Sequence, residues 1–232
     1  MGQPVVVVTG GGSGIGRAVC RRFAADGAQV VAAARSGKDL AETQSTIQQA
    51  GGKCHVLPTD VTSTEDVDAL IEDATDRFGR IDVLVNNAGI APLASLEETD
   101  PSLFDALTAV NIRGVYYGCR AAWPVMRKQG GGVIVNISSV LSTEVFPGFA
   151  AYSASKAWVN AWTKALAQEG KPFGIRVFAV APGAVETRLL RDAFPEFPKG
   201  QALDPDEVAG IVHMVAQPGC RHASGQTIFL QR

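Results

Sequence analysis

Cysteine and histidine are scarce in this chain, and neither residue type is grouped. The four cysteines (Cys20, Cys54, Cys119 and Cys220) form no C-x-x-C pair, so without a secretory context we expect reduced packing residues. The three histidines have no metal-ligand spacing, and no G-x-S-x-G motif is present. Neither a metal centre nor Ser-His hydrolytic chemistry is therefore expected.

Excess charge and long apolar runs are also lacking. The net charge of −2 gives no electrostatic footprint for nucleic acid or for an anionic membrane. We find no signal peptide and no uninterrupted apolar stretch of about 18 residues, the length that would suggest a membrane span. We therefore expect a soluble, cytoplasmic protein that binds neither nucleic acid nor membrane.

Apolar strand-like runs alternate with helical segments along the whole chain. With 232 residues, 46% of them hydrophobic, one large domain over 1–232 can bury a substantial core. Strands are expected at 5–8, 29–34, 53–58, 81–85, 133–138, 175–180 and 227–230. The intervening helices include one opened by a Thr62-x-x-Glu65 capping box and a long one opened by Asp100-Pro101. This alternation predicts an α/β fold, a doubly wound parallel sheet of the Rossmann type with helices on both faces.

A glycine-rich turn follows the first expected strand directly. Thr9-Gly10-Gly11-Gly12-Ser13-Gly14-Ile15-Gly16 connects the β-branched run 5–8 to a helical run over 17–26. Strand, glycine turn and helix are the context of a dinucleotide site, because glycines admit the pyrophosphate and the helix N-terminus offers free N–H groups. A tight connection without a ligand is the alternative, and the two flanking elements favour the nucleotide site.

The end of the second expected strand bears on which dinucleotide is bound. A carboxylate at this point accepts the ribose hydroxyls of NAD, whereas an arginine suits the additional phosphate of NADP. Here the acidic position holds Ala34, followed by Arg35 and Ser36. A solvated surface arginine is the alternative. The missing acid and the adjacent base together predict NADP.

Tyr152 and Lys156 are four residues apart in an expected helix. This spacing places both side chains on one helix face. A nearby ammonium group favours the phenolate and lowers the pKa of a tyrosine, which is ordinarily about 10. We therefore expect Tyr152 to act as a general acid whose pKa Lys156 lowers, although many helices contain the same spacing with no catalytic role.

Together the T-G-x-x-x-G-x-G and Y-x-x-x-K motifs resemble the short-chain dehydrogenase/reductase family, from Thr9 to about Thr187. The resemblance implies that Ser139, Tyr152 and Lys156 are catalytic and that Asn111 holds a water in the proton relay. It also implies a cofactor site. The implied cofactor-binding residues are Gly10, Ser13, Gly14, Ile15, Gly16, Arg35, Ser36, Asp60, Val61, Asn87, Ala88, Gly89, Tyr152, Lys156, Pro182, Gly183, Val185 and Thr187.

Several features go beyond these motifs. The segment 187–203 mixes apolar residues with prolines, which suits a movable flap over the site, although an ordinary surface connection would have the same composition. Many NADP-preferring relatives carry a base at the position of Ser13. Trp158 and Trp162 lie four apart on the expected catalytic helix, which in the family often pairs across a subunit interface, so a homodimer or homotetramer is expected.

From these features we expect an oxidoreductase that transfers a hydride between NADP(H) and a ketone or secondary alcohol. It is similar to bacterial 3-oxoacyl-carrier-protein reductases and carbonyl reductases, and its partner would be a small carbonyl or alcohol substrate. The alternatives are an NAD-preferring alcohol dehydrogenase of the same family and a catalytically silent nucleotide-binding protein. A sugar-nucleotide epimerase or dehydratase is a further alternative, but those relatives usually differ in glycine spacing.

Overall fold

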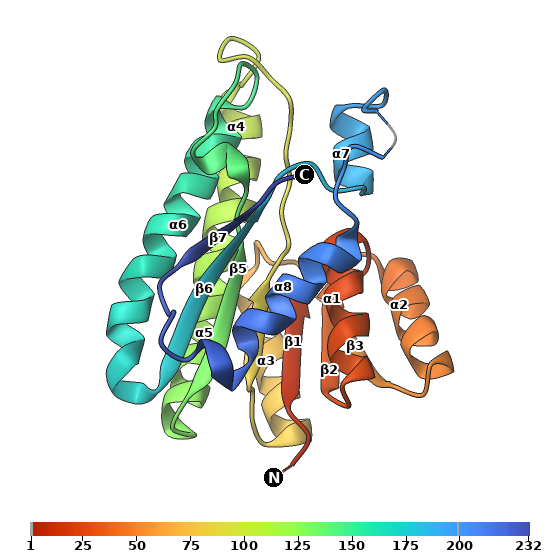
Figure 1. Cartoon of the computed structure of the whole chain (residues 1–232), viewed down its shortest axis with the longest axis vertical. Coiled ribbons are helices and arrows are strands. Elements are labelled where there is room, and N and C mark those ends of the chain that lie inside the picture. Colours follow the sequence, from red (N-terminus) through yellow and green to blue (C-terminus); the bar gives the residue numbers. More distant parts are fainter. Residues whose placement is uncertain (1, 199) are drawn as a thin grey trace.

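A parallel sheet of seven strands, in the order β3-β2-β1-β4-β5-β6-β7, forms the centre of the molecule (Figure 1). The computed structural model describes residues 2–198 and 200–232. The strands are β1 (Val5–Thr9), β2 (Gln29–Ala34), β3 (Lys53–Pro58), β4 (Val83–Asn86), β5 (Gly132–Ile137), β6 (Ile175–Pro182) and β7 (Thr227–Leu230). Because β1 pairs with β2 on one side and β4 on the other, the strand order reverses here, which is where such sheets bind ligands.

Helices connect the strands and cover both faces of the sheet. The α-helices are α1 (Gly14–Ala25), α2 (Gly37–Gln49), α3 (Thr64–Phe78), α4 (Pro101–Thr108), α5 (Gly114–Lys128), α6 (Ala150–Gly170), α7 (Arg188–Ala193) and α8 (Pro205–Ala216). A π-helical segment, η1 (Ala109–Arg113), joins α4 to α5, and short 3-10 turns lie at η2 (Val140–Ser142), η3 (Lys171–Phe173) and η4 (Pro218–Cys220). The predicted doubly wound parallel sheet is therefore confirmed.

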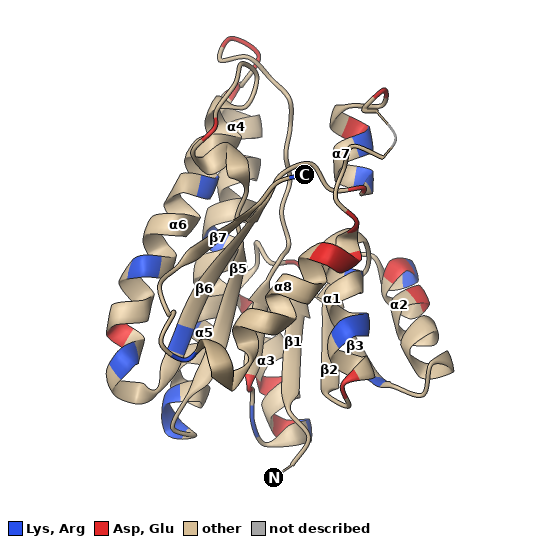
Figure 2. Ribbon diagram, viewed as in Figure 1, with Lys and Arg blue, Asp and Glu red and all other residues tan. Residues whose placement is uncertain are grey.

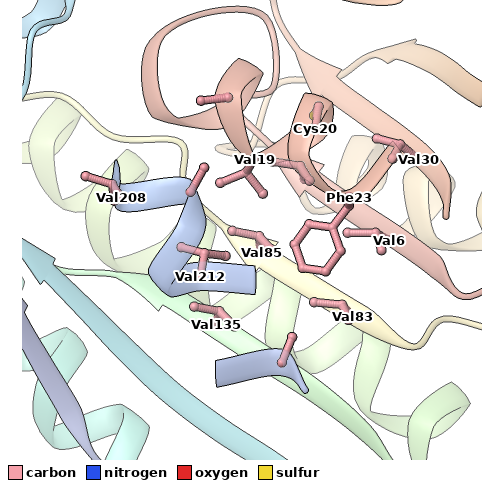
Figure 3. Packing of buried hydrophobic residues seen from close by; sticks show 14 of the residues in the cluster. Val6, Val19, Cys20, Phe23, Val30, Val83, Val85, Val135, Val208 and Val212 are labelled. Atoms are coloured by element: carbon pink, nitrogen blue, oxygen red, sulfur yellow. The ribbon is translucent and has the colours of Figure 1, made fainter. Parts of the chain in front are cut away.

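The hydrophobic core has two layers, one on each side of the sheet. Successive residues of a strand point to opposite faces. Val6 and Val8 accordingly join a cluster with residues of α1, α2 and α8, whereas Val7 packs with residues of α3, α5 and α6. In the first layer Phe23 of α1 points toward Val6 and Val83 (Figure 3). Burial on both faces explains why the strands are almost entirely apolar.

Charged residues lie mainly on helices and loops, and the strands carry few (Figure 2). None of the helices that the structure describes is long and apolar enough to cross a membrane. Within residues 2–198 and 200–232, no cluster of three or more His, Cys, Asp or Glu side chains could hold a metal ion. All four cysteines are free thiols, and three of them are buried.

Some predicted element ends were wrong by one to three residues. The strand expected at 81–85 is Val83–Asn86, and the strand expected at 175–180 extends to Pro182. The N-cap of α3 is Ser63, whose hydroxyl accepts a hydrogen bond from the Asp66 backbone N–H at 3.1 Å, so the capping box at Thr62 was wrong. The helix opened by Asp100 and Pro101 does contain Asn111, but within the π-helical segment.

Candidate active site

The glycine turn lies at the carboxyl end of β1 and is tied to the neighbouring strand by Asn87. The Asn87 amide nitrogen donates to the carbonyls of Thr9 (3.0 Å) and Gly10 (3.2 Å). Gly10 has a φ of +66°, and a Cβ there would lie 2.6 Å from the Asn87 amide nitrogen. A Cβ on Gly16 would collide with the Gly10 carbonyl. These two glycines are therefore required for the shape of the turn itself.

The N-terminus of α1 is open toward the turn. Ser13 is the N-cap, but its side chain makes no capping hydrogen bond with a described residue. The first turn (Gly14, Ile15, Gly16) carries no acidic side chain. Free N–H groups and the positive end of the helix dipole therefore remain available to an anion, which fits the pyrophosphate of a dinucleotide.

Arg35 and Asp60 lie beside each other at the ends of β2 and β3. The Arg35 side chain is exposed, and Ser36 caps α2 by accepting a hydrogen bond from the Asp39 N–H at 3.2 Å. Asp60 accepts hydrogen bonds from the Thr62 N–H (2.9 Å) and hydroxyl (2.8 Å). The bond from the Thr62 backbone lowers the pKa of Asp60, and the positive charge of Arg35 adds to that effect.

Ser139, Tyr152 and Lys156 converge from two elements. Ser139 follows β5, and its hydroxyl accepts a hydrogen bond from the Leu141 N–H at 3.1 Å. Tyr152 and Lys156 lie on α6, where the Lys156 Nζ is 5.7 Å from the centre of the tyrosine ring. The same Nζ donates to the Ile137 carbonyl at 2.8 Å, which holds the lysine against the end of β5.

Burial changes the acidity of both helix residues. Loss of hydration raises the pKa of Tyr152 to about 12, although a hydrogen bond with the Ser139 side chain lowers it in part. Burial lowers the pKa of Lys156 to about 8. The pKa of Tyr152 is therefore raised by burial, and not lowered as the spacing to Lys156 had predicted.

The Asn111 side chain is completely buried and forms hydrogen bonds with the backbone of a neighbouring loop. Its Oδ1 accepts a hydrogen bond from the Ile90 N–H, and its Nδ2 donates to the Ile90 carbonyl, both at 2.9 Å. The Nδ2 also donates to the Ser155 hydroxyl at 3.2 Å. The Asn111 side chain therefore anchors residue 90, and the expected role in holding a water stays a prediction.

Most of the predicted site residues line one cavity of about 540 Å³. The predicted residues that line it are Gly10, Ser13, Gly14, Ile15, Asn87, Ala88, Gly89, Ser139, Tyr152, Lys156, Pro182, Gly183, Val185 and Thr187. Six others do not line it: Gly16, Arg35, Ser36, Asp60, Val61 and Asn111. Of these, Gly16 and Asn111 support residues that do line the cavity, while Arg35, Ser36, Asp60 and Val61 follow the adjacent strands β2 and β3.

The predicted site residues left out a set of apolar lining residues. They come from the segment between β5 and α6 and from the segment around α7, and include Leu141, Phe146, Phe149, Leu189, Leu190, Phe194 and Phe197. The composition of 187–203 had indicated a covering segment. Phe146 and Phe149 gave no such signal, because a loop sequence does not show which side chains turn inward.

A switch-point cavity with a glycine turn at one end and a Ser-Tyr-Lys cluster at the other defines a nicotinamide-dependent oxidoreductase. Residues 4–197 match the family model described as short chain dehydrogenase. The chain therefore belongs to the short-chain dehydrogenase/reductase family of NAD(P)-dependent enzymes, which act on alcohol and ketone substrates.

Three relatives illustrate the likeness. The 3beta-hydroxysteroid dehydrogenase 1 of Eggerthella lenta is 39% identical over 97% of this chain and 91% of its own. The 3-ketoacyl-(acyl-carrier-protein) reductase of Brucella melitensis, complexed with NADH, is 35% identical with a TM-score of 0.90, covering 98% of this chain and 96% of that one. A variant of actinorhodin polyketide ketoreductase with NADPH is 32% identical with a TM-score of 0.94, covering 99% and 96%.

Proposed function

We propose that this protein is an NADP(H)-dependent enzyme that interconverts a ketone and a secondary alcohol. The observation that carries the proposal is the meeting of Ser139, Tyr152 and Lys156 in the same cavity as the glycine turn. Tyr152 is the proton donor in reduction and the proton acceptor in oxidation. A silent nucleotide-binding protein would not need this hydroxyl, phenol and ammonium together.

The residues present fit a nicotinamide dinucleotide. The uncapped start of α1 would hold the pyrophosphate, and Asp60 and Val61 would lie at the adenine. The segment Asn87 to Gly89 would support the adenosine ribose, and the nicotinamide side would be held by Pro182, Gly183, Val185 and Thr187. When bound, the cofactor supplies or accepts the hydride.

The protein's own part in the reaction is to hold the carbonyl and move a proton. The Ser139 hydroxyl holds the substrate oxygen, and Tyr152 protonates it as the carbon is reduced. With a pKa raised to about 12, Tyr152 carries its proton at neutral pH, as a proton donor must. With a pKa of about 8, Lys156 is mostly charged at pH 7. Its charge stabilises the negative charge that builds up on the phenol oxygen and so favours proton release.

The preference for NADP rests on the end of β2. Ala34 presents no carboxylate, and the exposed Arg35 can form charge-assisted hydrogen bonds with a phosphate. Such a contact contributes about 1.5–3 kcal/mol. Asp60 lies close enough to Arg35 for the arginine charge to lower the pKa of the Asp60 carboxyl group. Ser13 adds no second cation. We therefore expect a preference for NADP over NAD near the lower end of that free-energy range.

We also propose that the segment 187–203 is a flap over the substrate. Its base is closed by hydrogen bonds from the Glu186 N–H to the Leu203 carbonyl (2.9 Å) and from the Leu203 N–H to the Ala184 carbonyl (2.8 Å). Between these ends α7 lines the cavity. The two closed ends let the intervening segment move as a unit. Residue 199 of this segment lies outside the described residues.

A homodimer or homotetramer is proposed from the exposed side of α5 and α6. Trp158 and Trp162 stack with ring centres 5.1 Å apart, and Tyr116 lies 5.9 Å from Trp162. Large aromatic side chains of this kind are typical of subunit interfaces. We further propose a cytoplasmic location, because four free thiols fit a reducing compartment.

The test is to incubate the protein with NADPH or NADH and a panel of ketones while following the absorbance of the reduced cofactor. We expect oxidation of the cofactor that depends on ketone, with a higher kcat/KM for NADPH than for NADH. The reverse reaction is measured with the corresponding secondary alcohols and NADP+. Failure to turn over any ketone or alcohol with either cofactor would favour the silent nucleotide-binding protein.

A further inference from the structure

Four phenylalanines form one wall of the active-site cavity, which we call the phenylalanine wall: Phe146, Phe149, Phe194 and Phe197. Phe149 is its centre and is almost fully buried. The ring of Phe149 lies 5.3 Å from Phe146 and 5.8 Å from Phe194, between ring centres. It also meets the catalytic candidate Tyr152 edge to face at 5.8 Å. The wall therefore begins at the proposed proton donor.

Helix α7, which belongs to the proposed flap 187–203, extends from one end of the cavity to the other. At its start, the Thr187 methyl group would lie 3.0 Å from a Cβ on Gly14, so this end is beside the glycine turn. Directly after its other end, Phe194 of the phenylalanine wall packs against Phe149. A molecule that reaches Tyr152 on the side away from the glycine turn is therefore enclosed by aromatic rings.

Charged groups are nearly absent from the lining. Among the described residues that line the cavity there is no Asp, Glu or His, and the cations are Lys156 and Arg188. Lys156 is held by the Ile137 carbonyl at 2.8 Å. The Arg188 guanidinium is 3.7 Å from a carboxylate oxygen of Asp39 on α2, at the end beside the glycine turn.

Two charged groups that flank the phenylalanine wall in the sequence are engaged elsewhere. Arg191 pairs with Glu186 and donates to the Phe197 carbonyl at 2.6 Å. Glu144 accepts a hydrogen bond from Gln231 at 2.8 Å. Neither residue lines the cavity. Among the described residues that line the cavity, an anionic group placed against the wall would meet no cation other than the engaged Lys156 and Arg188, so it would lose its hydration without a free partner.

On these grounds we propose that the substrate is an apolar ketone with an aromatic or fused-ring body and no anionic group on that body. The proposal rests on the proposed function and specifies its substrate. Ring surface buried against phenylalanine is favourable both by its area and by edge-to-face contacts. In the reduction, the carbonyl carbon gains a hydride from the nicotinamide cofactor, which is oxidised, and the oxygen gains the Tyr152 proton, which solvent replaces.

The test compares three ketones with the parent protein: 2-acetylnaphthalene, 6-acetyl-2-naphthoate and butanone. The first two present the same ketone and ring system, and only the second carries a carboxylate. We expect kcat/KM for 2-acetylnaphthalene to exceed that for the naphthoate by at least about tenfold, because the buried carboxylate has no partner. It should exceed that for butanone by a similar factor, because butanone leaves the wall uncovered.

The variant Phe194→Ala tests the wall directly, since Phe194 is only half-buried and its removal leaves Phe149 in place. We expect the ratio of kcat/KM for 2-acetylnaphthalene to that for butanone to fall on the order of tenfold. The matched control is Phe104→Ala on α4, whose ring is 48% exposed and does not line the cavity. This control should keep the parent ratio. Circular dichroism and the melting temperature check that each variant is folded.

The outcomes separate the substrate class from the function. If kcat/KM for butanone and for the naphthoate equals that for 2-acetylnaphthalene, the substrate class is wrong and the proposed function stands. An unchanged substrate ratio in folded Phe194→Ala would also overturn the role of the wall. If the parent protein reduces no ketone with either cofactor, both the function and the substrate class fail.

Discussion

Tyr152 and Lys156 are both buried, and burial acts on their protons in opposite ways. It raises the pKa of the tyrosine to about 12 and lowers that of the lysine to about 8, so each group favours its neutral form. The sequence predicted that the two side chains share a helix face. It predicted a lowered pKa for Tyr152, however, and burial raises this pKa. The direction of the pKa shift depends on how much water the fold removes from the phenol. The four-residue spacing in the sequence does not show this.

Tyr152→Phe removes the acidic proton and keeps the ring that packs against Phe149. Ketone reduction should fall at least about a hundredfold, the effect typical of general acid–base catalysis. The Kd for NADP+, measured by calorimetry, should change little. Tyr116→Phe, which removes a phenol that does not line the cavity, is the matched control. Near-parental turnover in the Tyr152 variant would exclude the tyrosine as the acid.

Lys156 makes the stability of the protein depend on pH. Because its pKa is lowered to about 8, the folded chain loses this proton at a lower pH than the unfolded chain does, so the unfolded state binds more protons between these values. The free energy of unfolding should therefore rise with pH from about 8 to 10, by at most about 3 kcal/mol from this group.

The comparison is urea unfolding at several pH values for the parent and for Lys156→Met, which cannot titrate. Tyr152 is present in both proteins, so its own contribution cancels. We expect the parent to gain stability relative to the variant over this pH interval. Parallel pH curves for the two proteins would mean that the lysine keeps its ordinary pKa in the folded state.

At the scale of elements, a local signal was sufficient for the start of α4, although it was misplaced by one residue at the start of α3. Asp100 caps α4 as predicted and is followed by a proline in the first turn, and Asp204 caps α8 in the same way. The sequence did not predict the π-helical segment Ala109–Arg113 within the long helix. Its Asn111 bonds to Ile90, a residue 21 positions earlier. Contacts of this range come from the assembled fold, and local periodicity does not report them.

Asn111→Ala should destabilise the protein because it removes the partners of both the N–H and the carbonyl of Ile90. Unpaired buried polar groups cost about 1–3 kcal/mol each, and because both groups of Ile90 are only part-buried we expect a loss of about 2–4 kcal/mol in urea unfolding, the lower part of the sum. Asn160→Ala is the matched control, since the Asn160 side chain donates one hydrogen bond, to Ser142, at 2.8 Å. Equal effects of the two substitutions would show that Asn111 does not anchor the loop.

At the scale of the whole molecule, the alternation of strands and helices predicted the parallel sheet. Parallel strands joined by helices place all their carboxyl ends along one edge, so Gly10, Asn87 and Ser139 had to approach one another. The phenylalanine wall could not be predicted in this way. It joins Phe149, which precedes α6, to Phe194, 45 positions later, and this contact depends on how α7 lies over the cavity.

Cofactor choice should be measurable in the stability of the whole protein, because a ligand that binds only the folded state raises its melting temperature. A tenfold preference corresponds to about 1.4 kcal/mol. For a domain of this size that amounts to about 3–6 °C, since about 2–4 °C accompanies each kcal/mol. NADP+ should therefore raise the melting temperature more than NAD+ does at the same concentration, chosen well above both Kd values and measured by differential scanning fluorimetry without any substrate.

The double variant Ala34→Asp with Arg35→Ile should reverse this order, because the new carboxylate repels a phosphate and can accept ribose hydroxyls. Lys164→Gln, which removes one exposed positive charge from α6, is the control and should keep the parental order. Because the readout involves no turnover, it separates cofactor recognition at the end of β2 from the chemistry of Tyr152. A parent protein stabilised more by NAD+ than by NADP+ would refute the proposed role of Arg35 and leave the ketone chemistry untouched.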